Sequence, residues 1–134
     1  MKKVISIFLL TVFLISIFPA ASASSSIMPY ASQVFAEMGS HITISGGKVK
    51  GAADVKSWAI ADKLGMSTMV LYEENNSGGW TRIASASGKY GYNTTNYSYT
   101  ISATATAGKE YKFVVTFYGK VGGVTDTLTH TKYA

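Results

Sequence analysis

Side chains that could do acid–base or metal chemistry are few in this sequence and far apart along it. The two histidines are His41 and His130, and the absence of cysteine excludes a thiol nucleophile. His130 and Asp126 would lie on one strand face roughly 13 Å apart, too far for one metal ion or one proton relay. Glu73 and Glu74 are adjacent, so in a strand their carboxylates point to opposite faces. We therefore predict no catalytic residues, no metal site, no cofactor and no enzymatic activity.

Aromatic side chains are the one enrichment that points to binding. Tyr90, Tyr92, Tyr97 and Tyr99 fall within ten residues, and Trp80 lies on a neighbouring predicted strand. Tyrosine combines an apolar ring face with a polar tip, which suits sugar rings and protein partners. Tyr97 and Tyr99 would share a strand face with an isoleucine, so they can instead be core residues. The predicted binding platform is therefore Trp80, Tyr90 and Tyr92.

The elements that must position these rings follow a period of two. Polar and apolar residues alternate along most of the chain from His41 onward, as they do in half-buried strands. Threonine, valine, isoleucine and tyrosine are abundant there, and all four favour strands. Short glycine-rich turns separate the segments, which is typical of a two-sheet sandwich or a small barrel. The predicted strands cover residues 41–45, 48–56, 66–74, 80–85, 94–106, 111–120 and 124–131.

Three segments do not follow this pattern clearly. Residues 34–38 fit either a short helix or an edge strand. Residues 58–65 have some helical character, so they could form one helical turn, or an irregular crossover that carries Trp58, Ile60 and Leu64 into the core. Residues 87–93 contain two glycines and are typical of a loop.

A local motif before the 111–120 strand narrows the fold class. Residues 107–115, Ala-Gly-Lys-Glu-Tyr-Lys-Phe-Val-Val, resemble the turn into the sixth strand of immunoglobulin-like and fibronectin type III sandwiches. The resemblance implies that Tyr111 bonds back to the backbone at a corner between the sheets. An ordinary core tyrosine is the alternative. The fold class that we predict is all-β, an antiparallel immunoglobulin-like β-sandwich of about seven strands.

A second resemblance covers most of the chain after residue 23. The segments that carry it are residues 42–51 (Ile-Thr-Ile-Ser-Gly-Gly-Lys-Val-Lys-Gly), the hairpin return Gly79-Trp80 and the motif Gly108-x-x-Tyr111. They are similar to segments of small secreted proteins of Gram-positive bacteria that carry a domain of unknown function. This resemblance implies no activity and no site residues.

The N-terminal residues predict export. A basic head (Lys2, Lys3) precedes an almost wholly apolar run at residues 4–18, and Pro19 ends the run. Small residues up to Ala23 then offer a cleavage site, which is typical of a helical secretory signal peptide. A membrane anchor is the alternative, but a spanning helix needs about 20 apolar residues. The expected organisation is a signal peptide at 1–23, a lead-in segment at 24–40 and a β-sandwich domain at 41–134.

Charge and cysteine content restrict the expected partners. Without Lys2 and Lys3, ten basic residues stand against seven acidic ones, and the lysines are scattered. Nucleic-acid binding would need a concentrated basic patch, so no nucleic-acid partner is expected. No membrane contact is expected after cleavage. The lack of cysteine in a chain predicted to be secreted favours a bacterial exporter.

These observations predict a secreted, extracellular, noncatalytic binding module. It would contact cell-wall glycan or another surface protein through Trp80, Tyr90 and Tyr92, and its oligomeric state is left open. The alternative is a structural protein that self-associates by edge-strand pairing, because the 94–106 strand presents a row of uncharged hydroxyl side chains. A secreted enzyme or toxin is the third and least supported hypothesis.

Overall fold

The computed structural model describes residues 32–134, which form seven β-strands. The predicted signal peptide at residues 1–23 lies outside the described residues. Residues 32–134 contain no α-helix, and so no helix there is long and apolar enough to cross a membrane. The strands are β1 (Phe35–Ser45), β2 (Lys48–Ala61), β3 (Lys63–Glu74), β4 (Trp80–Gly91), β5 (Thr94–Thr104), β6 (Tyr111–Val121) and β7 (Val124–Tyr133).

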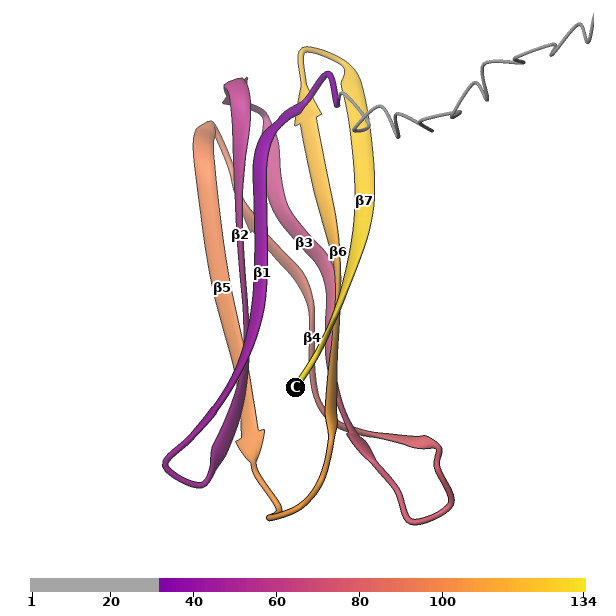
Figure 1. The fold of residues 1–134 in the computed structure, drawn as a ribbon. Coiled ribbons are helices and arrows are strands. Elements are labelled where there is room, and N and C mark those ends of the chain that lie inside the picture. Colours follow the sequence, from indigo (N-terminus) through magenta and orange to yellow (C-terminus); the bar gives the residue numbers. More distant parts are fainter. Residues whose placement is uncertain (1–31) are drawn as a thin grey trace, which may run out of the picture.

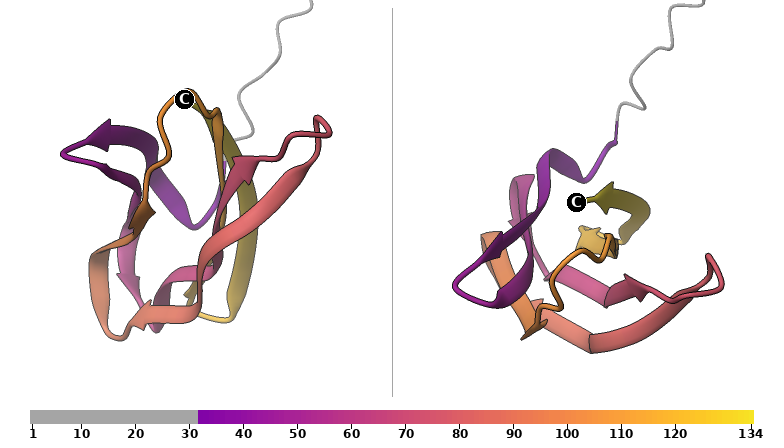
Figure 2. Two further views of the ribbon diagram at one scale, coloured as in Figure 1. Left: turned by 90° about the horizontal axis from the view of Figure 1, so that it is seen from below. Right: turned by 60° about the horizontal axis from the view of Figure 1, so that its bottom comes forward.

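The strands pair in antiparallel fashion and form two sheets. One sheet has the strand order β1-β2-β5, and the other has the order β4-β3-β6-β7. The sheets lie face to face (Figure 1), and Figure 2 shows the same arrangement from below and from an intermediate angle. The predicted all-β antiparallel sandwich is therefore confirmed, and the arrangement is compatible with an immunoglobulin-like fold.

The core lies between the sheets and is built by alternate residues of the central strands. On β6, Tyr111, Phe113, Val115 and Phe117 are all buried, as a period of two requires. The ring of Phe113 packs so closely on Gly51 of β2 that a Cβ atom at position 51 would lie 2.5 Å from it. Any side chain at this position would therefore displace the ring or push the two sheets apart.

Tyr111 closes the corner between β5 and β6. Its side chain is buried, and its hydroxyl oxygen accepts a hydrogen bond of 2.6 Å from the backbone N–H of Thr106. The hydroxyl can donate its own proton to a carboxylate oxygen of Glu73 at 2.9 Å or to the Thr106 carbonyl at 3.2 Å. Tyr111 thus bonds back to the backbone, as the resemblance of residues 107–115 implied, and it also ties β6 to the end of β3.

Residues 58–65 form no helical turn. They carry the chain from one sheet to the other, and the β2–β5 register is irregular between Lys56 and Ala61. The crossover alternative therefore holds, but its expected burial of Trp58 and Ile60 is wrong. β2 continues to Ala61, and β3 starts two residues later. Leu64 is buried as expected, but Trp58 is 70% exposed and Ile60 is 67% exposed. The physical reason is strand parity. Even-numbered residues of β2 face away from the core along most of the strand, and these two side chains keep that direction.

Two other segments are more regular than expected. β1 begins at Phe35, so most of residues 34–38, left open between helix and edge strand, belong to an edge strand. Phe35 and the neighbouring Val34 are buried in the core. Residues 87–93, expected to be a loop, mostly belong to β4, which pairs with β3 as far as Gly91. Pairing with a central strand therefore overrides the local preference of the glycines for a loop.

Candidate ligand-binding face

The three residues of the predicted platform do not lie together. Trp80 begins β4 and Tyr90 stands near its end, so roughly 33 Å of extended strand separates them. Tyr92 lies in the turn that follows β4, and its side chain is 64% exposed. Tyr97 and Tyr99 are partly buried and pack against the core. The structure therefore splits the platform between the two ends of β4.

Trp80 and Tyr90 nevertheless share one side of the four-stranded sheet. On β6, Phe113 and its alternate neighbours are buried, so Lys112, Tyr118 and the residues in register with them on β3, β4 and β7 point the other way. We call this surface the outer face. It consists of Trp80, Arg82, Ser85, Ser87 and Tyr90 on β4, Lys63, Gly65, Thr68, Val70, Tyr72 and Glu74 on β3, Lys112, Val114, Thr116, Tyr118 and Lys120 on β6, and Thr125, Thr127, Thr129, Thr131 and Tyr133 on β7.

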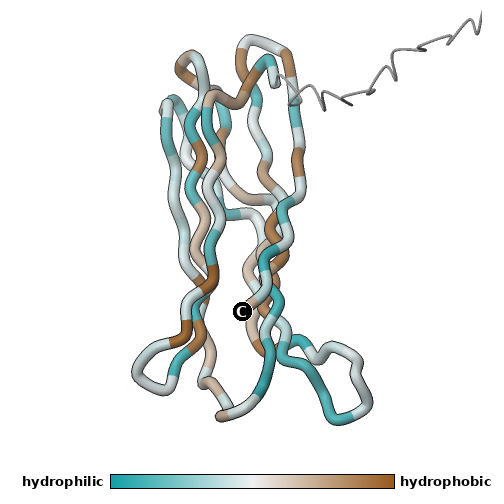
Figure 3. Tube along the Cα trace, in the orientation of Figure 1, coloured by the Kyte–Doolittle hydropathy of each residue, from teal (hydrophilic) through white to brown (hydrophobic). Residues whose placement is uncertain are grey.

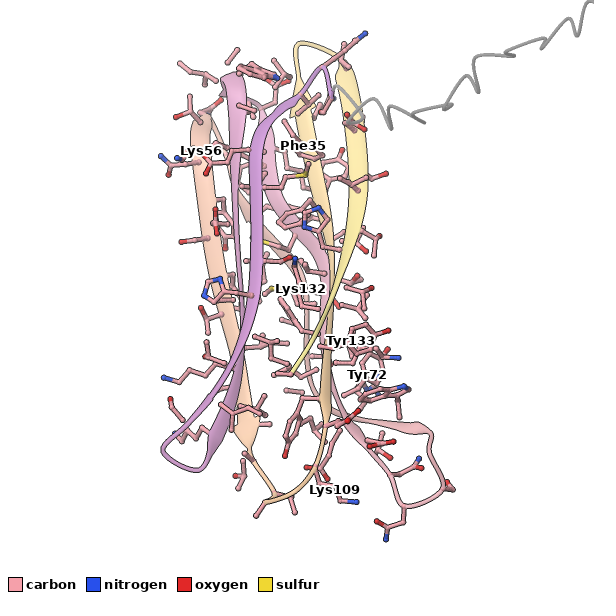
Figure 4. The ribbon with its side chains drawn as sticks, in the orientation of Figure 1. Phe35, Lys56, Tyr72, Lys109, Lys132 and Tyr133 are labelled. Carbon is pink, nitrogen blue, oxygen red and sulfur yellow. The ribbon has the colours of Figure 1, made fainter. Side chains whose placement is uncertain are left out.

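One group of aromatic rings gathers at the end of the outer face where β4 begins. The ring centroids of Trp80 and Tyr133 lie 6.0 Å apart. The ammonium nitrogen of Lys112 is 4.7 Å from the Trp80 ring centroid and 4.8 Å from that of Tyr72. Figure 4 shows Tyr72 and Tyr133 at this end of the sheet. We call these four residues the Trp80 cluster. Tyr133 is 67% exposed, and the other three side chains are half-buried.

Trp80 reaches Tyr133 although β4 and β7 are opposite edges of the sheet. A β-bulge interrupts the register between Leu71 and Tyr72 of β3, and it leaves Ile83 as an extra residue on β4. A bulge bends its strand and increases the local twist. The extra residue also changes the parity of β4, so that Trp80 and Arg82 face the same side of the sheet as Tyr72.

The tip of the β3–β4 hairpin holds the start of β4 in place. The hairpin projects beyond the sheets (Figure 1), and its tip is hydrophilic (Figure 3). Asn75 organises the tip, because its Oδ1 atom accepts hydrogen bonds from the backbone N–H groups of Ser77 and Gly79. Lys109, in the β5–β6 connection, donates a hydrogen bond of 2.6 Å to Oδ1 of Asn76. These contacts restrain the segment that leads into the Trp80 cluster.

A second group of rings occupies the opposite end of the outer face. Tyr90 and Tyr118 flank Gly65 in direct register, and their rings meet edge to face with centroids 5.6 Å apart. The ammonium nitrogen of Lys63 lies 4.0 Å from the Tyr90 centroid and 5.3 Å from the Tyr118 centroid. A Cβ atom at position 65 would collide with the backbone carbonyl oxygen of Lys89. We call Lys63, Tyr90 and Tyr118 the Tyr90 cluster.

Charge is uneven on the outer face. Between the two clusters the face carries threonine, serine and valine side chains, and the hydroxyls of Thr116 and Thr129 bond to one another at 2.9 Å. The lysines that look scattered in the sequence are therefore partly collected by the fold on one surface. Its cations are Lys63, Arg82, Lys112 and Lys120, and its carboxylates are Glu74 and, at its end, Glu110, whose carbonyl oxygen accepts a hydrogen bond from the Glu74 N–H.

The contacts of His130, considered above together with Asp126, are packing and hydrogen-bond contacts within the fold. The ring of His130 packs edge-on against Phe117 with centroids 5.1 Å apart, and its Nδ1 atom lies 3.1 Å from Oγ of Ser40. Burial lowers the pKa of the His130 imidazole, and the positive charge of Lys132 lowers it further. Both effects favour the neutral form of the imidazole. Among residues 32–134 no group of three His, Cys, Asp or Glu side chains is placed to hold a metal ion.

Sequence inspection identified one member of each cluster and missed the other members. Tyr118 and Lys112 alternate with buried residues of β6, so strand parity alone indicates that they face outward. Parity does not reveal that Lys112 lies over Tyr72 and Trp80, because this contact depends on the order β4-β3-β6. The missed members are Tyr72, Lys112 and Tyr133 in the Trp80 cluster, and Lys63 and Tyr118 in the Tyr90 cluster.

Comparisons with protein-family models, with curated protein sequences and with solved structures find no match for this chain. The function of the outer face must therefore be inferred from its own residues and their geometry.

Proposed function

We propose that this chain is a noncatalytic, extracellular binding module that holds a cell-wall glycan on its outer face. One observation carries the proposal: five aromatic rings and two lysines gather in two clusters on a single sheet face. The apolar face of an aromatic ring stacks on the apolar face of a sugar, while its polar tip stays in water. The hydroxyl side chains between the clusters offer donors and acceptors to sugar hydroxyls.

The rings of both clusters are held in place before any ligand arrives. Trp80 packs against Tyr133, and Tyr90 packs against Tyr118. A lysine ammonium lies over two rings in each cluster, a cation–π arrangement that further restrains the side chains. Less side-chain entropy is lost when a ligand binds to ordered rings, so this order favours affinity.

The wider context of the proposal is a secreted, immunoglobulin-like sandwich of bacterial origin. The two antiparallel sheets and the bond from Tyr111 to the Thr106 backbone support the immunoglobulin-like class. The basic head, apolar run and small residues of the first 23 positions support secretion. A module exported in this way would meet polymers of the cell surface, in agreement with a glycan ligand.

The glycan proposal predicts that the Trp80 cluster is required for binding. The double substitution Trp80→Ala with Tyr133→Ala should weaken co-sedimentation with purified bacterial cell wall, raising the apparent Kd roughly tenfold or more, because aromatic anchors dominate such contacts. The matched control is Trp58→Ala, which removes an exposed tryptophan from the other sheet and should leave binding unchanged. Failure of the unmodified protein to sediment, or full binding by the double variant, would contradict the proposal.

A second candidate function is self-association by strand pairing, and it rests on the position of β5. β5 is an edge strand, and its outward Ser98, Thr100, Ser102 and Thr104 side chains are exposed. An uncharged edge strand is open to pairing with another chain. If the chain self-associates, the molar mass measured by light scattering should rise with protein concentration. The substitutions Thr100→Lys and Ser102→Lys should suppress the rise, and a constant monomer mass at all concentrations would rule it out.

A further inference from the structure

We infer that the ligand of the outer face is a linear acidic polysaccharide that contacts the Trp80 cluster and the Tyr90 cluster at the same time. This inference rests on the proposed function and adds the chemical class of the glycan. Three features carry it: the sign of the charge on the outer face, the position of two lysines over aromatic rings, and the spacing of the clusters.

The first feature is the excess of positive charge. Of the seven acidic residues in the chain, Glu74 lies on the outer face, and the exposed Glu110 continues the β3–β6 register opposite it at the end of the face. Four basic residues therefore stand against two acidic ones. Lys63 and Lys120 stand directly opposite one another in the β3–β6 register. Like charges at such a cross-strand position destabilise a sheet, and an anion bound between them relieves the repulsion. The face as a whole attracts polyanions.

The second feature is the position of Lys63 and Lys112. Each ammonium nitrogen lies 4.0–5.3 Å from the centroids of two aromatic rings. An ammonium carries three N–H donors, and within residues 32–134 neither lysine has a carboxylate partner. A carboxylate that is attached to a sugar would therefore meet a cation and a stacking surface together. Charge-assisted hydrogen bonds of this kind are about twice as strong as neutral ones.

The third feature is the distance between the clusters. On β3, Tyr72 belongs to one cluster and Gly65 lies beneath the rings of the other, which corresponds to about 20 Å along the strand. The outward residues between them, Thr68 and Val70, are uncharged. A linear polymer that lies along β3 and β6 can reach both clusters. The second contact is then intramolecular, which raises the overall affinity of long chains over short fragments.

The aromatic rings favour an acidic polysaccharide over other polyanions. A polymer of phosphate alone supplies charge but no ring or apolar face to stack on Trp80 or Tyr90. A carboxylate-bearing polysaccharide supplies both at every repeat. The two sources of negative charge can therefore be separated by comparing polymers with and without sugar rings.

The other sheet provides a matched control surface. Lys48 and Lys50 are the most closely spaced lysines of residues 32–134, and in register they face only serine and threonine residues of β1 and β5. Lys56 of the same sheet is left out of the control, because it donates a hydrogen bond of 2.8 Å to Glu37 and this bond raises the pKa of its ammonium group. Removing Lys48 and Lys50 therefore changes the net charge by the same amount as removing Lys63 and Lys112, but it leaves both aromatic clusters intact.

The experiment measures binding of the full chain to immobilised polygalacturonate, to its fully methyl-esterified form and to polyphosphate. We expect the acidic polysaccharide to bind at least about tenfold more tightly than the ester or polyphosphate, and more tightly than its own short oligomers. Lys63→Gln with Lys112→Gln should abolish most of this preference, and Lys48→Gln with Lys50→Gln should retain it. Thermal unfolding of each double variant checks that both remain folded.

The possible outcomes separate this inference from the proposed function. Equal binding to polygalacturonate and to its ester would overturn the acidic ligand while leaving a glycan-binding module in place. Equal loss in the two double variants, or polyphosphate binding as tight as polygalacturonate binding, would show diffuse charge attraction only and would also overturn it. Oligomers that bind as tightly as the polymer would refute the contact with both clusters. If neither these polymers nor purified cell wall bind, both the inference and the proposed function are wrong.

Discussion

Replacing Phe113 with alanine should lower the free energy of unfolding by about 3–5 kcal/mol. The ring is fully buried on β6 and packs against Gly51 of the facing sheet. Its removal deletes apolar contacts and leaves a cavity that two hydrogen-bonded sheets cannot close without shifting. Because a single domain has a total stability of only about 5–15 kcal/mol, the melting temperature should fall by about 12 °C or more. Calorimetry of the purified protein measures both quantities.

A double-mutant cycle with Gly51 tests whether the packing of the Phe113 ring on Gly51 causes this loss of stability. Gly51→Ala should destabilise the protein by about 1–3 kcal/mol, as overpacking does, because its Cβ atom would lie 2.5 Å from the Phe113 ring. The same change should cost much less in the Phe113→Ala protein, where the ring is gone. Val114→Ala, on the half-buried outer side of β6, is the control and should cost less than Phe113→Ala. Strictly additive effects at positions 51 and 113 would contradict the proposed packing.

The second large effect is expected for Tyr111→Phe, which removes one oxygen atom from a buried corner. The loss in the free energy of unfolding should be about 1–3 kcal/mol, because the Thr106 N–H and the Glu73 carboxylate each lose a partner. The phenyl ring keeps its apolar contacts in the core. Urea unfolding followed by tyrosine and tryptophan fluorescence measures the change without relying on heat-induced transitions.

Two variants separate the hydrogen bonds of Tyr111 from a general effect of losing a hydroxyl. Tyr133→Phe removes a hydroxyl from a side chain that is 67% exposed and should change stability by less than about 0.5 kcal/mol. Glu73→Gln keeps an acceptor for the Tyr111 hydroxyl and should cost less than Tyr111→Phe. If Tyr111→Phe and Tyr133→Phe are equally stable, the corner hydrogen bonds contribute nothing to the fold.

Much of the fold was predictable because alternation is a local property of an extended chain. The buried face of β6, with Phe113 and Phe117, follows from the sequence pattern and is confirmed. The segment with Trp58 and Ile60 was misjudged because large apolar side chains suggest burial, although strand parity directs these two outward. The end of β4 was misjudged because glycines suggest a loop when the pairing partner is unknown.

The candidate site was less predictable than the fold. Tyr90 and Trp80 could be chosen as aromatic candidates from composition and position, and they share one sheet face, but they lie at opposite ends of β4. Trp80 instead meets Tyr133 of the opposite edge strand. This contact requires the strand order and the β-bulge that leaves Ile83 unpaired in the β3–β4 register. Neither feature has a signal in the hydrophobic pattern of a single strand.

By itself, the sequence determined the strands and, within most of them, the direction of each side chain, because backbone geometry makes alternate residues of any strand face opposite sides. Only the tertiary structure decided which outward side chains become neighbours. Strand order brought the ammonium of Lys112 over the rings of Tyr72 and Trp80, and the close approach of backbones at Gly65 let the rings of Tyr90 and Tyr118 meet. The physical reason is that cross-strand contacts join residues distant in sequence, and they exist only after the sheets have assembled.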